Sequence, residues 1–200
     1  MTKVYINDHL QDFDLNEAFA LMSRQRREYL LRYRNERAQR AGAAAYVLLC
    51  EGLRELYGVE EAPSFAFGEH GKPSIIGRED IFFSLSHCRE AACCAISSEP
   101  VGIDVESLRS FSPSLLRRTM NPEEAESILA ASHPQLAFVH LWTQKEAYLK
   151  LIGTGLVDEL HEVLTQAHER GFVFETNDNA DGRYVYSLCF KASPDSPSLL

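Results

Sequence analysis

Two stretches of the chain carry acidic residues whose spacing could bring several carboxylates together. In the stretch VGIDVE, Asp104 and Glu106 are two residues apart and would project from the same side of a strand. Carboxylates this close repel each other unless a cation or a basic group lies between them. Glu146, in a later helical stretch, could add a third carboxylate, and oxygen ligands favour Mg²⁺ or Mn²⁺. The pattern predicts a magnesium site at these three residues, with solvated acids on an exposed strand as the alternative.

The stretch LWTQKEAYLKLIGTGL, in the last third of the chain, puts charged residues on a helix that has an apolar face. Lys145 lies three residues after Trp142 and four before Leu149, so it belongs to the apolar face. A lysine there must reach water with its amine or find an anion. We therefore expect Lys145 beside a phosphate or a carboxylate. For Glu146 and Lys150, four residues apart, a weak ion pair along the helix is a sufficient alternative explanation.

Further polar residues follow a strand and a turn earlier in the chain. Ser86 and His87 end the apolar run IFFSLSH, where both could bind a ligand and His87 could contact a phosphate or carry a proton. A capping or core histidine is the alternative, and serine hydrolysis is disfavoured because neighbours on a strand point apart. Lys72, between a glycine and a proline, suits a phosphate or purine contact, although a surface turn explains it as well. The chain has neither a Walker-type glycine loop nor a dinucleotide-binding fingerprint.

The net charge of the chain disfavours nonspecific binding to nucleic acid or to an anionic membrane. The 200 residues include 29 acidic and 20 basic residues, a formal net charge of −9, and no apolar run is long enough for a membrane helix. The positive charge is uneven, because seven arginines but only two acids, Glu28 and Glu36, lie between residues 24 and 40. This segment suggests a local site for an anionic ligand, with a solvated helix face as the alternative.

The five cysteines show no spacing that is typical of metal binding. They lie in apolar surroundings, and the first ten residues lack an apolar signal core. We therefore expect reduced, buried thiols in a cytoplasmic protein.

The elements that must position these residues mix helices and strands without regular alternation, which predicts an α+β fold. We expect a helical start, with a helix over Glu36–Tyr57 that ends at Gly58, and further helix starts at Asn121-Pro122 and at Ser132-His133-Pro134. The expected strands are Ser64–Phe67, Ile81–Leu85, Ala91–Ile96, Val101–Val105, Phe172–Glu175 and Arg183–Phe190. A composition break near residue 100 suggests two parts, residues 1–100 and 101–191, followed by a loose tail, residues 192–200.

Taken in order, four of these stretches resemble the 4′-phosphopantetheinyl transferases of the Sfp type. They are Gly71-Lys72-Pro73, Phe83-Ser84-Leu85-Ser86-His87, Gly102-Ile103-Asp104-Val105-Glu106, and Trp142-Thr143-Gln144-Lys145-Glu146-Ala147 with Lys150, Gly153, Gly155 and Leu156. Each stretch alone is a weak indication of this family, whereas all four in this order are a strong indication. The resemblance implies an enzyme that moves the phosphopantetheine arm of coenzyme A (CoA) to a serine of an acyl or peptidyl carrier protein and releases adenosine 3′,5′-bisphosphate.

The resemblance also implies roles for individual residues. Those expected to bind Mg²⁺, or Mn²⁺, are Asp104, Glu106 and Glu146. Those expected to contact CoA are Lys72, Ser86, His87, Lys145, Lys150, Arg40 and, if no gap intervenes, Arg24 and Arg27. Those expected to take part in the reaction are Asp104, Glu146 and Lys150. The base would be Glu146 or a carboxylate at Glu123 or Glu124, acting directly or through a water.

The fold that the resemblance implies is a pseudodimer of two similar α+β halves, with CoA in the cleft between them and a monomeric chain. Two other classes of function share parts of the pattern. Another magnesium-dependent enzyme that acts on phosphates, such as a nucleotide hydrolase, would use the same carboxylates and basic residues. A carrier-protein-binding module without catalysis is the third class, and the intact set of charged motif residues disfavours it. The resemblance does not choose among fatty-acid, polyketide and peptide carriers, nor among acylated forms of CoA.

Overall fold

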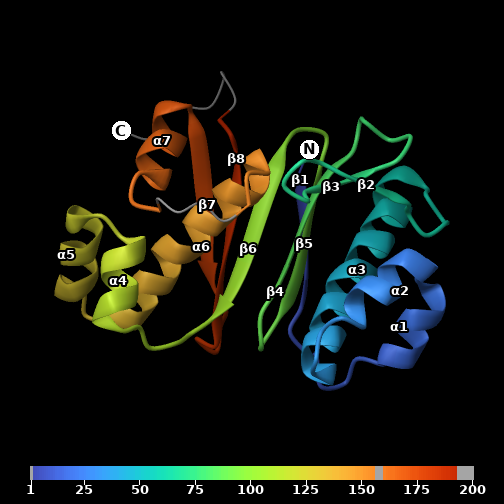
Figure 1. Cartoon of the computed structure of the whole chain (residues 1–200), viewed down its shortest axis with the longest axis horizontal. Coiled ribbons are helices and arrows are strands. Elements are labelled where there is room, and N and C mark those ends of the chain that lie inside the picture. Colours follow the sequence, from blue (N-terminus) through green and yellow to red (C-terminus); the bar gives the residue numbers. More distant parts are fainter. Residues whose placement is uncertain (1, 156–159, 193–200) are drawn as a thin grey trace.

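The structure is a computed structural model that describes residues 2–155 and 160–192 (Figure 1). The elements, in chain order, are β1 (Thr2–Asn7), α1 (Leu15–Leu21), α2 (Arg24–Leu30), α3 (Glu36–Tyr57), β2 (Phe65–Phe67), β3 (Pro73–Ile75), β4 (Phe82–His87), β5 (Ala92–Ser97), β6 (Val101–Ser107), α4 (Pro113–Thr119), α5 (Pro122–Ala130), α6 (Pro134–Ile152), α7 (Val163–Glu169), β7 (Phe172–Asp178) and β8 (Tyr184–Lys191). The long strands occupy the middle of the molecule, with α1–α3 on one side and α4–α7 on the other (Figure 1). This mixture confirms the predicted α+β class.

Two three-stranded antiparallel sheets contain the longer strands. One has the order β1-β5-β4 and the other has the order β6-β8-β7, while β2 pairs with β3. In each three-stranded sheet the last strand along the chain lies in the centre, and a long helix, α3 or α6, precedes the second strand. This repetition is compatible with two similar halves. The pseudodimer and a boundary near residue 100 stay predictions.

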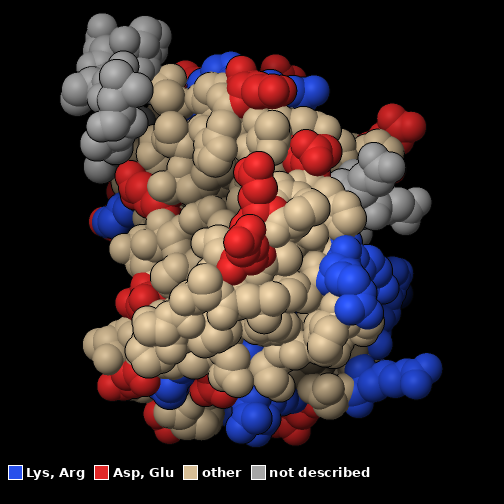
Figure 2. All heavy atoms as spheres, turned by 90° about the vertical axis from the view of Figure 1, so that its left-hand side faces the viewer, with Lys and Arg blue, Asp and Glu red and all other residues tan. Residues whose placement is uncertain are grey.

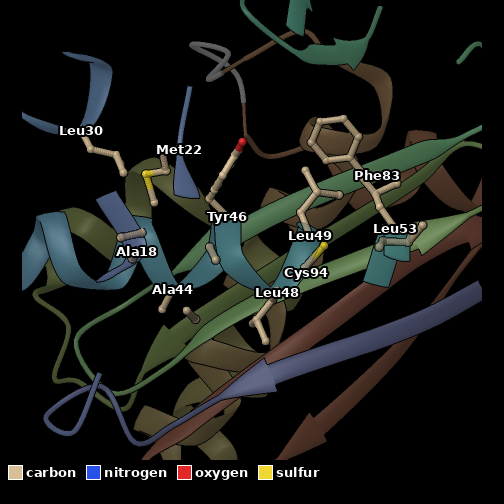
Figure 3. Packing of buried hydrophobic residues seen from close by; sticks show 14 of the residues in the cluster. Ala18, Met22, Leu30, Ala44, Tyr46, Leu48, Leu49, Leu53, Phe83 and Cys94 are labelled. Atoms are coloured by element: carbon tan, nitrogen blue, oxygen red, sulfur yellow. The ribbon is translucent and has the colours of Figure 1, made fainter. Parts of the chain in front are cut away.

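Helix α3 covers the sheet β1-β5-β4 with a face of small and aliphatic side chains. Gly58 ends the helix in the left-handed conformation, with φ of 64°, as the sequence predicts. Removal of apolar surface from water, worth about 25 cal/mol per Å², holds the helix on the sheet. Side chains of this core include Tyr46, Leu48, Leu49, Leu53, Phe83 and Cys94 (Figure 3).

The two sheets meet where β4 lies against β6, and two serine side chains join them. The Oγ of Ser84 accepts a hydrogen bond from the backbone N–H of Ile103 at 3.1 Å, and the Oγ of Ser86 accepts one from Val105 at 3.2 Å. Both serines are buried, so the hydroxyls satisfy backbone donors that have lost contact with water. Ser86 is thereby placed directly opposite the predicted metal ligand Asp104.

Most elements expected from the sequence are present, several with longer ends. Helix α5 begins with the expected capping box, in which Asn121 and Glu124 exchange side-chain and backbone hydrogen bonds. Helix α6 begins at Pro134 after His133, without a side-chain cap. The expected helical character of the first 60 residues holds for α1, α2 and α3, but the chain begins with a strand, because Thr2–Asn7 forms β1 by pairing with β5. Pairing with a strand 90 residues away is a tertiary effect that helix-forming composition does not show.

Some expectations concern parts of the chain with little structural description. The motif residue Leu156, and all of the predicted loose tail except Ala192, lie outside the described residues.

The five cysteines are free thiols, three buried and two half-buried. Among the helices of the described ranges, none combines the length and apolar character that crossing a bilayer requires.

Candidate active site

The region where β4 lies against β6 is called the join between the two sheets, and Asp104 is its central acidic residue. It lies on β6 and is only 4% exposed. Its Oδ1 accepts hydrogen bonds from Ser86 Oγ at 2.8 Å and from Lys150 Nζ at 2.6 Å. Its Oδ2 is buried and has no hydrogen-bond partner among the residues that the structure describes. A buried carboxylate oxygen without a partner is costly, so this atom is suited to a ligand that carries positive charge.

Glu106 and Glu146 bring two further carboxyl groups to the same place. Burial raises the pKa of Glu106, and the nearby Asp104 carboxylate raises it further. Burial and Asp104 likewise raise the pKa of Glu146 to about 7. Both shifts express the cost of holding like charges together away from water. A divalent cation would relieve this repulsion, so the chemistry of the three acids fits Mg²⁺ or Mn²⁺.

These acids do not yet form a ready three-ligand cluster. Over residues 2–155 and 160–192, no group of three or more His, Cys, Asp or Glu side chains is arranged to hold a metal ion. Lys150 provides the physical reason, because its ammonium already neutralises the Oδ1 oxygen of Asp104. The magnesium site at Asp104, Glu106 and Glu146 stays a prediction, and the structure adds that a lysine already pairs with one of the three acids.

Lys150 and Ser86 form the polar centre of the join. Burial lowers the pKa of Lys150, but the carboxylate of Asp104 more than offsets that effect, and the net shift is upward. Lys150 Nζ also donates to Ser86 Oγ at 2.6 Å. With a bond donated to Asp104 and another accepted from Val105, the Ser86 hydroxyl has no bonding capacity left. Ser86, expected to contact CoA, therefore acts here as a structural bridge.

Two adjoining pockets open on either side of this centre. The first, called the basic pocket, has a volume of about 330 Å³ and is lined by Arg26, Tyr29, Tyr33, Ala45, His70, Gly71, Lys72, Pro73, Phe83, Ser84, Leu85, His87, Glu146, Leu149, Lys150, Gly153 and Gly155. The second, called the acidic pocket, is lined by Leu85, Ser86, His87, Asp104, Glu106, Arg118, Trp142, Glu146, Lys150 and Leu160. Leu85 and the polar residues His87, Glu146 and Lys150 line both. The basic pocket combines residues from both sides of residue 100, as a cleft between two parts requires.

His87 and Lys72, both expected to contact CoA, lie in the wall of the basic pocket. Burial, and then the charge of Lys150, lower the pKa of His87 to about 4, so its imidazole is neutral near pH 7. Its ring packs edge-on against Tyr33, with centroids 5.8 Å apart. The ammonium of Lys72 donates to the carbonyl oxygen of Leu151 at 2.5 Å, near the end of α6. Lys72, directly before β3, thereby links that part of the chain to α6, the helix that carries Glu146.

Arg26 is a cleft residue that the sequence interpretation missed. It lines the basic pocket, its Nε is buried without a hydrogen-bond partner in the described structure, and burial lowers the pKa of its guanidinium. Arg26 lies four residues before the fully buried Leu30 on α2, so both share the inner face of that helix. This spacing is visible in the sequence and could have singled out Arg26 from its neighbours.

The three arginines predicted to contact CoA lie elsewhere. Arg24 is 92% exposed and pairs with Glu28, and Arg27 donates to the carbonyl oxygen of Phe19 at 2.6 Å. Arg40 binds the carbonyl oxygens of residues 11 and 13, each at 3.1 Å, and the carboxylate of Glu36. None of the three lines the basic or the acidic pocket. Arg27 links α2 to α1 and Arg40 links α3 to the segment before α1, whereas the pair of Arg24 stays within α2.

Lys145 is buried, as the spacing predicts, but it does not enter either pocket. Its Nζ donates to Glu124 Oε2 at 2.6 Å and to the carbonyl oxygens of Thr119 and Leu160 at 2.9 and 2.8 Å. The expectation of a nearby carboxylate is confirmed, whereas the expected contact with CoA is not supported. The contact also distinguishes Glu124, which binds Lys145, from its neighbour Glu123.

Comparison with known proteins agrees with this geometry. Residues 100–195 match the model of the 4′-phosphopantetheinyl transferase superfamily. A 4′-phosphopantetheinyl transferase of Bacillus subtilis is 29% identical, over 96% of this chain and 92% of its own length. The 4′-phosphopantetheinyl transferase Sfp of Bacillus subtilis (strain 168) is 26% identical, over 97% and 92%. Residues 100–195 thus carry the match to the superfamily, and the similarity to 4′-phosphopantetheinyl transferases extends over nearly the whole chain.

A further relative is more similar over a shorter span. The 4′-phosphopantetheinyl transferase HetI of a Nostoc species is 37% identical over half of this chain and 47% of its own length. The family match begins at residue 100 and so includes Asp104, Glu106, Glu146 and Lys150, but not the Arg26 and Lys72 side of the cleft.

Proposed function

We propose that the protein transfers the 4′-phosphopantetheine group of CoA to a serine of an apo acyl or peptidyl carrier protein, in a reaction that depends on Mg²⁺. One observation supports this above all others: His87, Glu146 and Lys150 line both the basic and the acidic pocket. A pyrophosphate that passes from one pocket to the other would meet all three side chains. The nucleotide end of the donor would then lie on one side of the join and the acceptor on the other.

The basic pocket suits the nucleotide part of CoA. It offers the cationic side chains of Arg26, Lys72 and Lys150, which can neutralise phosphate oxygens. The rings of Tyr29 and Tyr33 border the same space and offer stacking surface for adenine. Phosphates would compete with the carbonyl oxygen of Leu151 for the ammonium of Lys72 and would supply the partner that Arg26 Nε lacks.

Asp104, Glu106 and Glu146 are the residues that would hold Mg²⁺. The ion would neutralise the pyrophosphate and stabilise negative charge as the bond to the leaving group breaks. Lys150 contributes a second positive charge beside Asp104. Together these groups lower the electrostatic cost of bringing an alcohol to a doubly charged pyrophosphate.

The reaction needs a base for the serine hydroxyl. Glu146 is the better candidate, since it borders both pockets and so lies where the pyrophosphate and the acceptor would meet. Glu124 is engaged by Lys145 and by the backbone N–H of Asn121. In the proposed step the serine oxygen bonds to the phosphorus that carries the pantetheine arm and its proton passes to Glu146. The bond from that phosphorus to the bridging oxygen breaks, and adenosine 3′,5′-bisphosphate departs with that oxygen.

The carrier would bind through a local surface rather than by overall attraction, because carrier proteins are acidic and this chain has a net charge of −9. On the side of the molecule that bears α4–α7, acidic side chains are spread over the centre while Lys and Arg gather at one edge (Figure 2). Arg118, at the rim of the acidic pocket, is a basic residue in the right place. A monomeric state and a cytoplasmic location belong to the same proposal.

Mass spectrometry of a carrier tests the proposal. The protein is incubated with CoA, Mg²⁺ and an apo carrier, and the intact carrier is weighed. A mass gain equal to phosphopantetheine, lost when EDTA is added, is the expected result. Nucleotide release without a heavier carrier would instead indicate a hydrolase, and carrier binding with neither product would indicate a binding module.

A further inference from the structure

Lys145 is the most buried charged side chain in the described part of the chain, at 1% exposure, yet it does not line either pocket. An ammonium group has three N–H donors and no acceptor. The three donors are matched by three acceptors: the Glu124 carboxylate and the carbonyl oxygens of Thr119 and Leu160. The side chain therefore has no donor left for a substrate phosphate.

The three acceptors belong to segments that are separate along the chain. Thr119 ends α4, Glu124 lies in the first turn of α5, and Leu160 lies just ahead of α7. Two further contacts tie the same segments together. His161 Nε2 lies 2.9 Å from the carbonyl oxygen of Arg117, and the side-chain amide of Asn121 donates to the carbonyl oxygen of His161 at 3.4 Å. Lys145 thus anchors a small three-segment assembly to α6.

This assembly forms one wall of the acidic pocket and no part of the basic pocket. Arg118, next to Thr119, lines the acidic pocket, as does Leu160 itself. The lining of the basic pocket includes no residue of α4 or α5 and not Leu160. A change that loosens the assembly should therefore alter the side where the acceptor enters and leave the nucleotide side intact.

We infer that Lys145 is a positioning residue for the carrier-protein side of the reaction: it holds the wall formed by Arg118 and Leu160 against α6 and makes no contact with CoA. The inference rests on the proposed function for the identity of the acceptor. The buried pair with Glu124 makes the wall sensitive, because removing one charge leaves the other buried without its partner. The remaining carbonyl oxygens would also lose their donors.

Two lysines that each donate to a backbone carbonyl oxygen, one behind the wall and one in the basic pocket, provide the comparison. Lys145→Met removes the ammonium behind the wall, and Lys72→Met removes one that lines the basic pocket. For each variant, CoA affinity is measured by calorimetry and steady-state constants are measured for both CoA and carrier. Lys145→Met should leave the Kd of CoA within about twofold of wild type and lower kcat/KM for the carrier by about tenfold or more. Lys72→Met should do the reverse: it should raise the Kd of CoA and have the smaller effect on kcat/KM for the carrier.

Two further measurements keep the outcome decisive. If Lys145→Met does not fold, Glu124→Gln takes its place. This variant removes the negative charge beside Lys145, while its side-chain oxygen can still accept the backbone N–H of Asn121, and it should show the same split in a milder form. Amide hydrogen exchange should rise in residues 113–119 and 160–163 of both variants and not in the β4–β5 hairpin.

Each result has a defined meaning. A Kd for CoA raised as much in Lys145→Met as in Lys72→Met, or unchanged exchange in the wall segments, would overturn the positioning role. If wild-type protein binds CoA but does not modify the carrier, the proposed function fails instead. The exchange measurement then still decides whether Lys145 holds the wall.

Discussion

The two long helices of the protein each pack on a three-stranded sheet but present different chemistry. Helix α3 buries a nearly uniform face of small residues, including Ala41, Ala43 and Ala44, against the sheet β1-β5-β4. Helix α6 buries Thr143 and Lys145 and presents Glu146 and Lys150 at its edge. The first helix contributes only Ala45 to the lining of the basic pocket, whereas the second supplies the charged residues Glu146 and Lys150.

The same difference extends to the strands and loops around each helix. Residues before position 100 contribute Arg26, Lys72 and the neutral His87 to the cleft. Residues after position 100 contribute the three carboxylates of Asp104, Glu106 and Glu146, and also the ammonium of Lys150. One region is therefore built to receive anions and the other to receive a cation and a proton. The proposed reaction needs both, which explains why the site lies at their join.

Substitution of Asp104 should have the largest effect on the division of the cleft into an anion-binding side and a cation-binding side. Asp104→Ala takes away the carboxylate that both Lys150 and a divalent cation would use, so transfer should fall by about a thousandfold or more. Asp104→Asn, which keeps the shape and the bond from Ser86, should be nearly as inactive if charge is what matters. The carrier mass assay measures the loss, and circular dichroism shows whether the fold is kept. Near-normal transfer by either variant would remove Asp104 from the metal assignment.

Loss of the candidate base should be the next largest effect. Glu146→Gln keeps the size of the side chain but cannot accept the serine proton, so kcat should fall by about a hundredfold to a thousandfold. Glu123→Gln, on the exposed first turn of α5, is the matched control and should be close to wild type. If Glu146→Gln changed KM for CoA and left kcat unaltered, the carboxylate would be a binding group and not the base.

Arg26 and Arg24 sharpen the comparison on the anion-binding side. Both lie on α2, but only Arg26 lines the basic pocket. Arg26→Ala should raise the Kd of CoA by about tenfold, the loss of one charge-assisted contact, while Arg24→Ala should leave it unchanged. Calorimetry measures both affinities. Equal effects would show that CoA meets the exposed arginines and not the buried one.

His87 should give the smallest effect, a change in how stability depends on pH. Its pKa is about 4 in the folded protein and about 6.5 when unfolded, so protonation favours the unfolded state as the pH falls through this window. Between pH 7 and 5 this costs the wild type about 2 kcal/mol of unfolding free energy, or about 5 °C in Tm. His87→Asn lacks this contribution and should lose less stability over that range.

Thermal unfolding of both proteins at the two pH values checks the expectation. His168→Asn, which changes an exposed histidine on α7, should follow the wild type. A His87→Asn variant with the wild-type slope would show that His87 is not held neutral by its surroundings.

The sequence identifies the acidic side of the site better than the basic side. Strand alternation places Asp104 and Glu106 together, and helical spacing predicts that Lys145 is buried beside an anion. The partner of Lys145 depends on how α4 and α5 fold over α6, which local spacing does not contain. The family resemblance therefore assigned Lys145 to CoA, while the structure gives it to Glu124.

The arginines show the opposite difficulty. Seven of them lie within seventeen residues, and charge alone cannot say which one faces the cleft. The short helix α2 is oriented by Leu30, and that packing turns Arg26 inward and leaves Arg24 in solvent. Similarly, β1 forms because β5 accepts it, a pairing that is not visible in the first seven residues. Long-range packing decides these features.

The central claim is that the pyrophosphate of CoA lies at the join, against a cation held by the carboxylates that follow residue 100. Phosphorus NMR of protein-bound CoA with substoichiometric Mn²⁺ in place of Mg²⁺ tests it directly, because a paramagnetic ion broadens the nearest nuclei most. The account predicts strong broadening of the pyrophosphate signals, weaker broadening of the 3′-phosphate signal, and loss of this difference in Asp104→Ala. Equal broadening of all three phosphates in the wild type, or the same pattern without Asp104, would contradict it.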